Sequence, residues 1–226
     1  MTAEETAKNK LLNCYADIIE KLKHEVPGGA TNPLLVDIPD GYFGSQKTRV
    51  MIFGQETNDW HGEFKQEIDY SEFVKKYHRF FIDKKSKYSN SGIFMQFLNS
   101  LEEDIKGEAS VVWNNVVKIG KAKGAGLPSA NILEWQKNLN KFIEQEIEIL
   151  KPQAIIFLTG PSYDKFLPSK PSNIEKYTNE FKPRQIGKLE CCGVPALRTY
   201  HPKYLRLSGN EKRYKELILS FIKNPK

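Results

Sequence analysis

The chain has too few cysteines for a disulfide-stabilised or cluster-binding protein. Its 226 residues include three, with Cys191 and Cys192 adjacent and Cys14 far from both. Zinc and iron–sulfur sites need several cysteines at defined spacing, and small secreted folds carry even-numbered sets of them. We therefore expect no metal, no disulfide framework, no other cofactor and a reducing, cytoplasmic environment.

The sequence also lacks a long apolar run. A membrane-crossing helix needs about 20 consecutive apolar residues, and no stretch approaches that length. Residues 1–5 contain no basic segment leading into an apolar one, which argues against a secretory signal. Internal repeats and low-complexity tracts are missing as well. The sequence predicts no membrane partner and one monomeric domain over residues 1–226.

Acidic residues are outnumbered by basic ones. The chain has 34 Lys and Arg against 28 Asp and Glu, which gives a net charge of +6 and a pI near 9.0. A basic surface favours a polyanion such as nucleic acid, because each neutralised phosphate releases counterions. Many small soluble proteins are equally basic, so charge alone leaves the partner open.

Short apolar runs alternate with helical patterns along the chain. Runs typical of buried strands cover 50–53, 111–113, 154–158 and 194–199. Helical spacing covers 2–22, with a capping box at Thr2 and Glu5, and then 70–81, 93–101, 132–150 and 214–221; residues 170–184 are polar and predict a loop insertion. This alternation predicts an α/β fold in three αβα layers, with a mostly parallel central sheet that binds ligands at the carboxyl ends of its strands.

Polar clusters follow three of the four expected strands. They are residues 54–58 after the first strand, Asn114 and Asn115 after the second, and His201 with Pro202 after the last. A carboxylate, an amide and an imidazole in one crevice can orient water, bind a planar polar group and stabilise a leaving anion.

These clusters resemble motifs of the uracil-DNA glycosylase superfamily. The segment 50–58 resembles the first motif, a strand that ends in Gly, then Gln or Glu, then a water-positioning residue, here Glu56. Residues 115–118 are similar to the Asn-Val-Val-Lys of the thermostable iron–sulfur branch, in which the Asn binds the uracil edge. Residues 201–206 resemble the second motif, His-Pro followed by a loop that enters the minor groove, and 151–160 resembles the strand before it.

The resemblance implies a DNA glycosylase-like hydrolase that removes uracil or a related deaminated base from single- or double-stranded DNA. It implies that Glu56 orients the water and that His201 donates a hydrogen bond to the base oxygen. The base-binding residues would be Gly54, Gln55, Asn58 and Asn115, with Trp60 or Phe64 as the stacking aromatic. The DNA-binding residues would be Lys118, Pro202, Lys203, Tyr204 and Arg206.

The sequence departs from the family patterns in three places. Thr57, Asn58 and Asp59 stand where the family-one pattern has Pro, Tyr and His, and that Tyr excludes thymine. Glu56 stands where the iron–sulfur branch has Ala, and that branch needs four cysteine ligands. These departures leave the base specificity open.

Each candidate residue also has a structural interpretation. Gly54 can serve a positive-φ turn, Glu56 can cap a helix or pair with a lysine, and Asn115 can form an Asx turn. A His before Pro is often structural, Lys203 and Arg206 can be a solvated face, and Trp60 and Phe64 can be core residues. Two other functions are therefore open: a catalytically silent nucleic-acid-binding member of this fold, and a small-molecule or nucleotide hydrolase that uses the same crevice.

Overall fold

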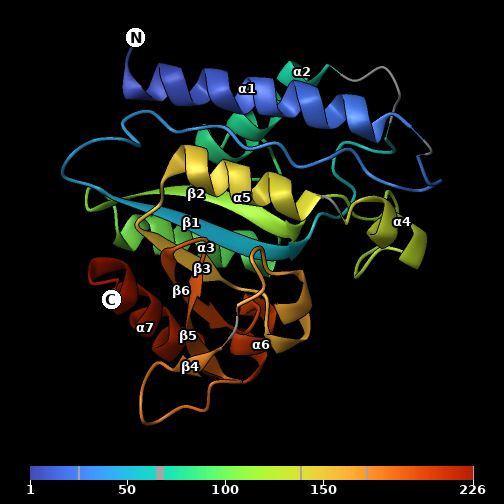
Figure 1. Cartoon of the computed structure of the whole chain (residues 1–226). Coiled ribbons are helices and arrows are strands. Elements are labelled where there is room, and N and C mark those ends of the chain that lie inside the picture. The colour runs from blue at the N-terminus through green and yellow to red at the C-terminus, as the bar shows by residue number, and fades with distance from the viewer. Residues whose placement is uncertain (25, 65–68, 138, 172, 226) are drawn as a thin grey trace.

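A six-stranded sheet forms the middle layer of the computed structural model, which describes residues 1–24, 26–64, 69–137, 139–171 and 173–225 (Figure 1). The strand order is β2-β1-β3-β6-β5-β4. Four strands run parallel: β1 (Thr48–Glu56), β2 (Ala109–Val117), β3 (Ala154–Phe157) and β6 (Val194–Thr199). At one edge β5 (Ile186–Cys191) and β4 (Glu175–Lys176) are antiparallel. The predicted α/β fold with a mostly parallel sheet is confirmed.

Helices cover both faces of the sheet (Figure 1). On one face α1 (Ala3–Leu22) packs against α5 (Leu139–Leu150), with α2 (Tyr70–Tyr77) beside α1. On the other face α3 (Gly92–Asp104), α6 (Pro202–Leu207) and α7 (Glu211–Lys223) contact one another. The remaining helices are the π-helix η1 (His78–Ile82), α4 (Ala130–Trp135) and the 3₁₀-helix η2 (Pro161–Phe166). Among the described residues, no helix combines the length and apolarity that membrane crossing requires.

Helix α1 follows directly from its sequence. The Thr2 side chain accepts the Glu5 backbone N–H and the Glu5 side chain accepts the Thr2 backbone N–H, so the predicted capping box is confirmed. Leu11, Tyr15 and Ile19 recur on one helical face and are buried. That face joins the continuous apolar core around the sheet.

The two strands that carry the polar clusters are longer than their apolar runs. Gly54 pairs with Asn115 and Glu56 with Val117 in the β1–β2 ladder. Residues 54–56 and both asparagines of the second cluster therefore belong to the strands themselves, whereas the sequence placed them after the strands; Thr57 and Asn58 do follow β1. Because Asn115 belongs to the ladder, the Asx-turn interpretation of this residue is wrong.

Two other predictions need correction. The helix expected over 132–150 is divided into α4 and α5, and the side chain of Gln136, the C-cap of α4, bonds to the backbone N–H and C=O of Ile119. The polar segment 170–184 is not only a loop, since it contains β4, which pairs with β5. Strand β5 itself was not predicted because Gly187, Lys188 and Glu190 interrupt its apolar pattern.

Candidate active site

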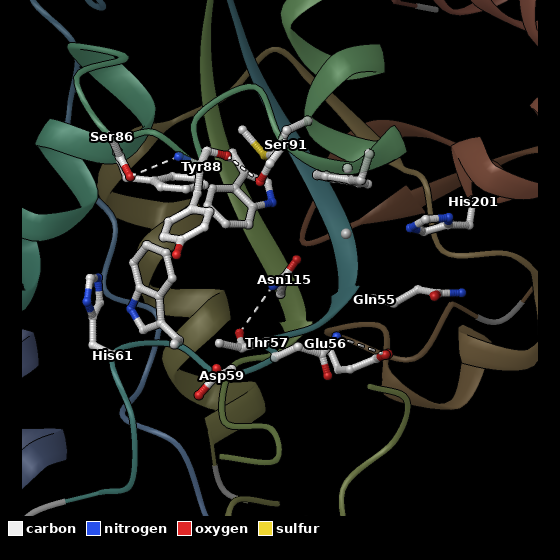
Figure 2. Close-up of a pocket in the computed structure, with 18 of the residues that line it drawn as sticks. Gln55, Glu56, Thr57, Asp59, His61, Ser86, Tyr88, Ser91, Asn115 and His201 are labelled. Carbon is white, nitrogen blue, oxygen red and sulfur yellow. Dashed lines mark hydrogen bonds between the residues drawn. The ribbon is translucent and has the colours of Figure 1, made fainter. Parts of the chain in front are cut away.

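A cavity of about 740 Å³ opens where β1, β2 and β6 end (Figure 2). This volume lies in the range of small-ligand pockets. Its walls come from four parts of the chain: residues 54–62, residues 80–95 in part, Trp113 with Asn115, and His201. The structure therefore brings together the first, second and last polar clusters, as the parallel-sheet prediction required.

Gly54 allows Asn115 to approach the floor of this cavity. A Cβ atom at position 54 would lie 2.4 Å from Asn115 Oδ1 and 3.0 Å from Phe94 Cζ. Gly54 is not among the residues with positive φ. The glycine is needed for space, and the prediction that it serves a positive-φ turn is wrong.

The Asn115 amide is held in one orientation at the centre of the cavity (Figure 2). Its Nδ2 donates to Thr57 Oγ1 at 3.1 Å, and its backbone N–H donates to Asn114 Oδ1 at 2.9 Å. Oδ1 accepts no hydrogen bond from the part of the chain that the structure describes. A fixed amide with an unused acceptor and a second N–H can bind the edge of a planar polar ring.

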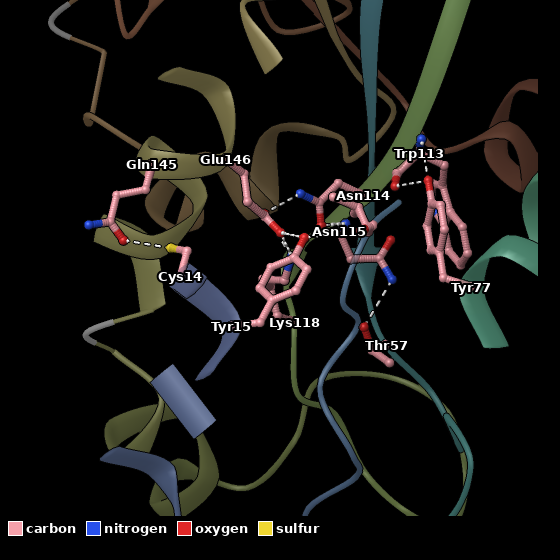
Figure 3. Close-up of polar contacts among 11 residues, drawn as sticks. Cys14, Tyr15, Thr57, Tyr77, Trp113, Asn114, Asn115, Lys118, Gln145 and Glu146 are labelled. Atoms are coloured by element: carbon pink, nitrogen blue, oxygen red, sulfur yellow. Dashed lines mark hydrogen bonds and ion pairs between the residues drawn. The ribbon is translucent and has the colours of Figure 1, made fainter. Parts of the chain in front are cut away.

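A buried polar network lies behind Asn115 (Figure 3). Lys118 Nζ is 2.7 Å from Glu146 Oε1, and both side chains are fully buried. Glu146 also accepts from Tyr15 Oη at 3.0 Å and from Asn114 Nδ2 at 2.8 Å. The Lys118 ammonium cannot contact a phosphate from this position, so the predicted DNA-binding role of Lys118 is wrong.

Two neighbouring side chains hold the Glu56 carboxylate. Tyr163 Oη donates a hydrogen bond to Glu56 Oε2, and Asn58 Nδ2 lies 3.4 Å from Oε1. Burial, followed by the bond to Glu56, raises the pKa of Tyr163, so its hydroxyl stays protonated and donates. Among the described residues Glu56 neither caps a helix nor pairs with a lysine.

Sequence reasoning missed Tyr163, although a signal for it was present. This tyrosine lies on η2, just after β3, whose carboxyl end was one of the four expected site positions. Gln55 makes the same connection between strands, because its Nε2 donates to Thr159 O at 2.8 Å. Gln55 lines the cavity and also ties the end of β1 to the end of β3.

His201 faces Glu56 across the end of the sheet, and its burial favours the neutral imidazole. Burial lowers the pKa of His201, while the nearby Glu56 charge opposes that shift. Nδ1 accepts the Lys203 backbone N–H at 3.1 Å, so the neutral ring carries its proton on Nε2. The ring stacks on Phe94 with centroids 5.6 Å apart. His201 also caps α6. The residue therefore has a structural role in addition to its place in the cavity.

The aromatic residues of the cavity differ from those predicted. Trp60 lines it, as expected, and is 7 % exposed. Phe64 instead packs edge-on against Trp135 at 5.3 Å and is not part of the lining, so its predicted stacking role is wrong. Phe94 and Tyr88 line the cavity and were not predicted. The helical spacing around Phe94 indicated a core residue.

The segment after His201 forms the short helix α6. Lys203 and Tyr204 are exposed, which suits the predicted DNA contacts. Pro202 is buried as the first residue of α6, so its predicted DNA contact is wrong. Arg206 is exposed, but Glu211 accepts from its guanidinium at 2.6 and 3.1 Å, so a phosphate would have to compete for it. Leu207, absent from the predicted set, is 78 % exposed.

Within the described ranges, no three His, Cys, Asp or Glu side chains are grouped so that they could hold a metal ion. The site therefore consists of a carboxylate, an amide and a neutral imidazole around an aromatic-lined cavity at the carboxyl end of a mostly parallel sheet. That combination defines an α/β protein with a polar, aromatic-lined pocket at the carboxyl end of its sheet. The sequence model of the Uracil DNA glycosylase superfamily matches residues 41–223, and the chain belongs to this superfamily. No curated protein matches the chain.

Proposed function

We propose that this protein is a DNA glycosylase that hydrolyses the N-glycosidic bond of uracil or a related deaminated base. The observation that carries the proposal is the meeting of Glu56, Asn115 and His201 in one cavity (Figure 2). An extruded base needs a polar edge partner, an aromatic surface and a route for its developing charge. Asn115, the ring of Phe94 or Tyr88, and His201 supply these three requirements.

The proposed reaction needs no covalent intermediate with the protein. The bond between the sugar C1′ and the base nitrogen breaks, and its electron pair leaves with the base. The oxygen of water bonds to C1′, and its proton passes to Glu56, whose negative charge also stabilises the cationic sugar. His201 Nε2–H donates to the base oxygen on which negative charge accumulates. A neutral imidazole that donates at Nε2 suits this role, because Nδ1 is already occupied as an acceptor.

The exposed side chains of α6 are the proposed contact with duplex DNA. Leu207 is 78 % exposed and Tyr204 is 54 % exposed, and both follow His201 within six residues. Apolar side chains that enter a base stack can fill the space that an extruded nucleotide leaves. Leu207→Ala should therefore slow base release from a duplex more than from a single strand, which already lacks the stacked partner strand.

A base-release assay tests the main proposal. Single- and double-stranded oligonucleotides carrying uracil, hypoxanthine or xanthine are incubated with wild type, Glu56→Gln, His201→Asn and the exposed-loop control Glu63→Gln. We expect release by the wild type and the control, and a loss of roughly 100-fold or more in the two site variants.

Failure of this assay would select another function. Salt-dependent DNA binding without release of any base would identify a catalytically silent nucleic-acid-binding protein. Stabilisation against heat by nucleosides or nucleotides, with no effect of DNA, would identify a small-molecule hydrolase or binding protein instead.

A further inference from the structure

Helix η2 contacts β1, which carries Glu56, and β6, which precedes His201. Tyr163, on η2, donates its hydroxyl to Glu56 at the end of β1. The next residue, Asp164, forms an ion pair with Arg198 on β6, with Oδ1 3.0 Å from Nε and Oδ2 3.2 Å from Nη2. Arg198 lies three residues before His201. One short helix thus bonds directly to Glu56 and is anchored to the strand that leads to His201.

One partner of each η2 contact is buried. The exposed fraction is 8 % for Tyr163 and 2 % for Arg198, whereas the Asp164 side chain is 30 % exposed. Hydrogen bonds to a charged partner are stronger than neutral ones and restrict the side chains that make them. Tyr163 does not line the cavity, so its hydroxyl acts on Glu56 and not on a bound ligand.

We propose that Tyr163 is a positioning residue that keeps the Glu56 carboxylate directed at the attacking water. The proposal rests on the glycosylase function above. Three polar groups face Glu56 among the described residues: the Tyr163 hydroxyl from η2, the Asn58 amide from its own loop and the His201 imidazole from the β6–α6 junction. Tyr163 holds Oε2 from a neighbouring element, whereas Asn58 Nδ2 is 3.4 Å from Oε1 and lies two residues away on the same loop.

Tyr163→Phe is the variant that tests this role, since it removes the hydroxyl and keeps the ring. A carboxylate that points away from the water fails in the transition state and leaves ground-state binding unchanged. In Tyr163→Phe the kcat for base release should therefore fall by roughly tenfold or more with little change in KM, as expected for the loss of one charge-assisted bond. Tyr177→Phe is the matched control, because Tyr177 donates to Leu217 O at 3.4 Å, away from the site. It should keep the wild-type kcat and KM.

A measurement without turnover separates this proposal from the function on which it depends. The side-chain carboxyl ¹³C resonance of Glu56, assigned by its loss in Glu56→Gln, should change its chemical shift in Tyr163→Phe at a fixed pH, and should keep it in Tyr177→Phe. An unchanged chemical shift and an unchanged kcat in Tyr163→Phe would overturn the positioning role while leaving the glycosylase proposal intact. Base release absent from the wild type, together with a changed Glu56 chemical shift in Tyr163→Phe, would overturn the glycosylase proposal and keep the Tyr163 contact.

Discussion

Lys118 and Glu146 form a fully buried salt bridge, with Nζ 2.7 Å from Oε1. This pair lies behind Asn115, which lines the floor of the cavity. Lys118 Nζ also donates to Asn114 Oδ1 at 3.0 Å, and the same oxygen accepts the Asn115 backbone N–H. Because both charged side chains are fully buried, this pair does not meet a ligand directly. Its role is to fix Asn114 and, through it, Asn115.

Removing one partner of this salt bridge should destabilise the fold strongly. Lys118→Met leaves the Glu146 charge buried without its partner, and such changes cost about 3–5 kcal/mol in the free energy of unfolding. The double variant Lys118→Met, Glu146→Leu should recover part of that loss, because apolar pairs often replace buried ion pairs at little cost, although Asn114 Nδ2 loses its acceptor. Urea unfolding of the wild type and both variants measures the difference. A double variant as unstable as Lys118→Met would contradict this explanation.

Gly54→Ala should impair the site with little effect on the rest of the fold. The added methyl group meets Asn115 Oδ1 at 2.4 Å, so the amide must move from its position at the cavity floor. We expect base release to fall at least about tenfold, since a displaced edge partner costs more than about 1.4 kcal/mol of transition-state binding. Gly209→Ala is the control for replacing a glycine by alanine, because a Cβ at position 209 meets nothing within 4 Å. Its positive φ adds backbone strain, so it is a demanding control. Gly54→Ala with wild-type release rates would show that Asn115 does not bind the base.

The neutral state of His201 predicts a dependence of stability on pH. Burial lowers the pKa of His201 in the folded protein, so the unfolded chain takes up this proton first as the pH falls. The contribution of His201 to stability is therefore present above about pH 6.5 and is lost as the pH falls through the unfolded and then the folded pKa. Below about pH 6.5 the wild type should lose more unfolding free energy than His201→Asn, which keeps a capping side chain. Burial also lowers the pKa of His61. Because His61 is present in both proteins, its contribution cancels in the difference between their pH curves. Parallel pH curves would show that His201 is not held neutral.

Much of the fold and part of the site could be predicted from sequence. Strong periodicity located α1, α3 and α7, and buried apolar runs located β1, β2, β3 and β6. The order of strands and polar clusters brought Glu56, Asn115 and His201 together, because parallel strands present their carboxyl ends at one edge. Strand β5 could not be predicted, since its pairing with β6 depends on tertiary contacts and its own sequence alternates weakly.

The misassigned site residues share one cause. Sequence gives residue type but not whether a side chain faces solvent, so Lys118 was interpreted as a phosphate ligand and Phe64 as a stacking surface. Both side chains instead meet partners distant in sequence, Glu146 and Trp135. Tyr163 was missed because its contact with Glu56 joins residues 107 positions apart, and sequence alone does not show such a pairing.

Asn32 gives a prediction for the segment that precedes the family match, which begins at residue 41. This side chain is 2 % exposed, and its Nδ2 lies 3.0, 3.4 and 3.2 Å from the carbonyl oxygens of residues 61, 62 and 63. Those residues follow Asp59 in the cavity wall, where Asp59 and His61 adopt φ values of 44° and 55°. Backbone in this region is unfavourable for residues other than glycine and persists only when its surroundings hold it.

Asn32→Ala should therefore release this wall of the cavity. Loss of the shared donor removes a partner from the carbonyl groups of His61 and Glu63, at a cost of about 1–3 kcal/mol, while Gly62 O keeps the Asn32 backbone N–H at 3.2 Å. We expect faster amide hydrogen exchange in residues 57–64 and weaker substrate binding, with little change in exchange in β3. Asn99→Ala is the matched control, because Asn99 Nδ2 also bonds to loop oxygens, those of Ser89 and Asn90, at 3.0 and 3.2 Å. If exchange in 57–64 stays at the wild-type rate in Asn32→Ala, the wall is held by its own backbone pairing, such as the bridge between Thr31 and Glu63, and not by Asn32.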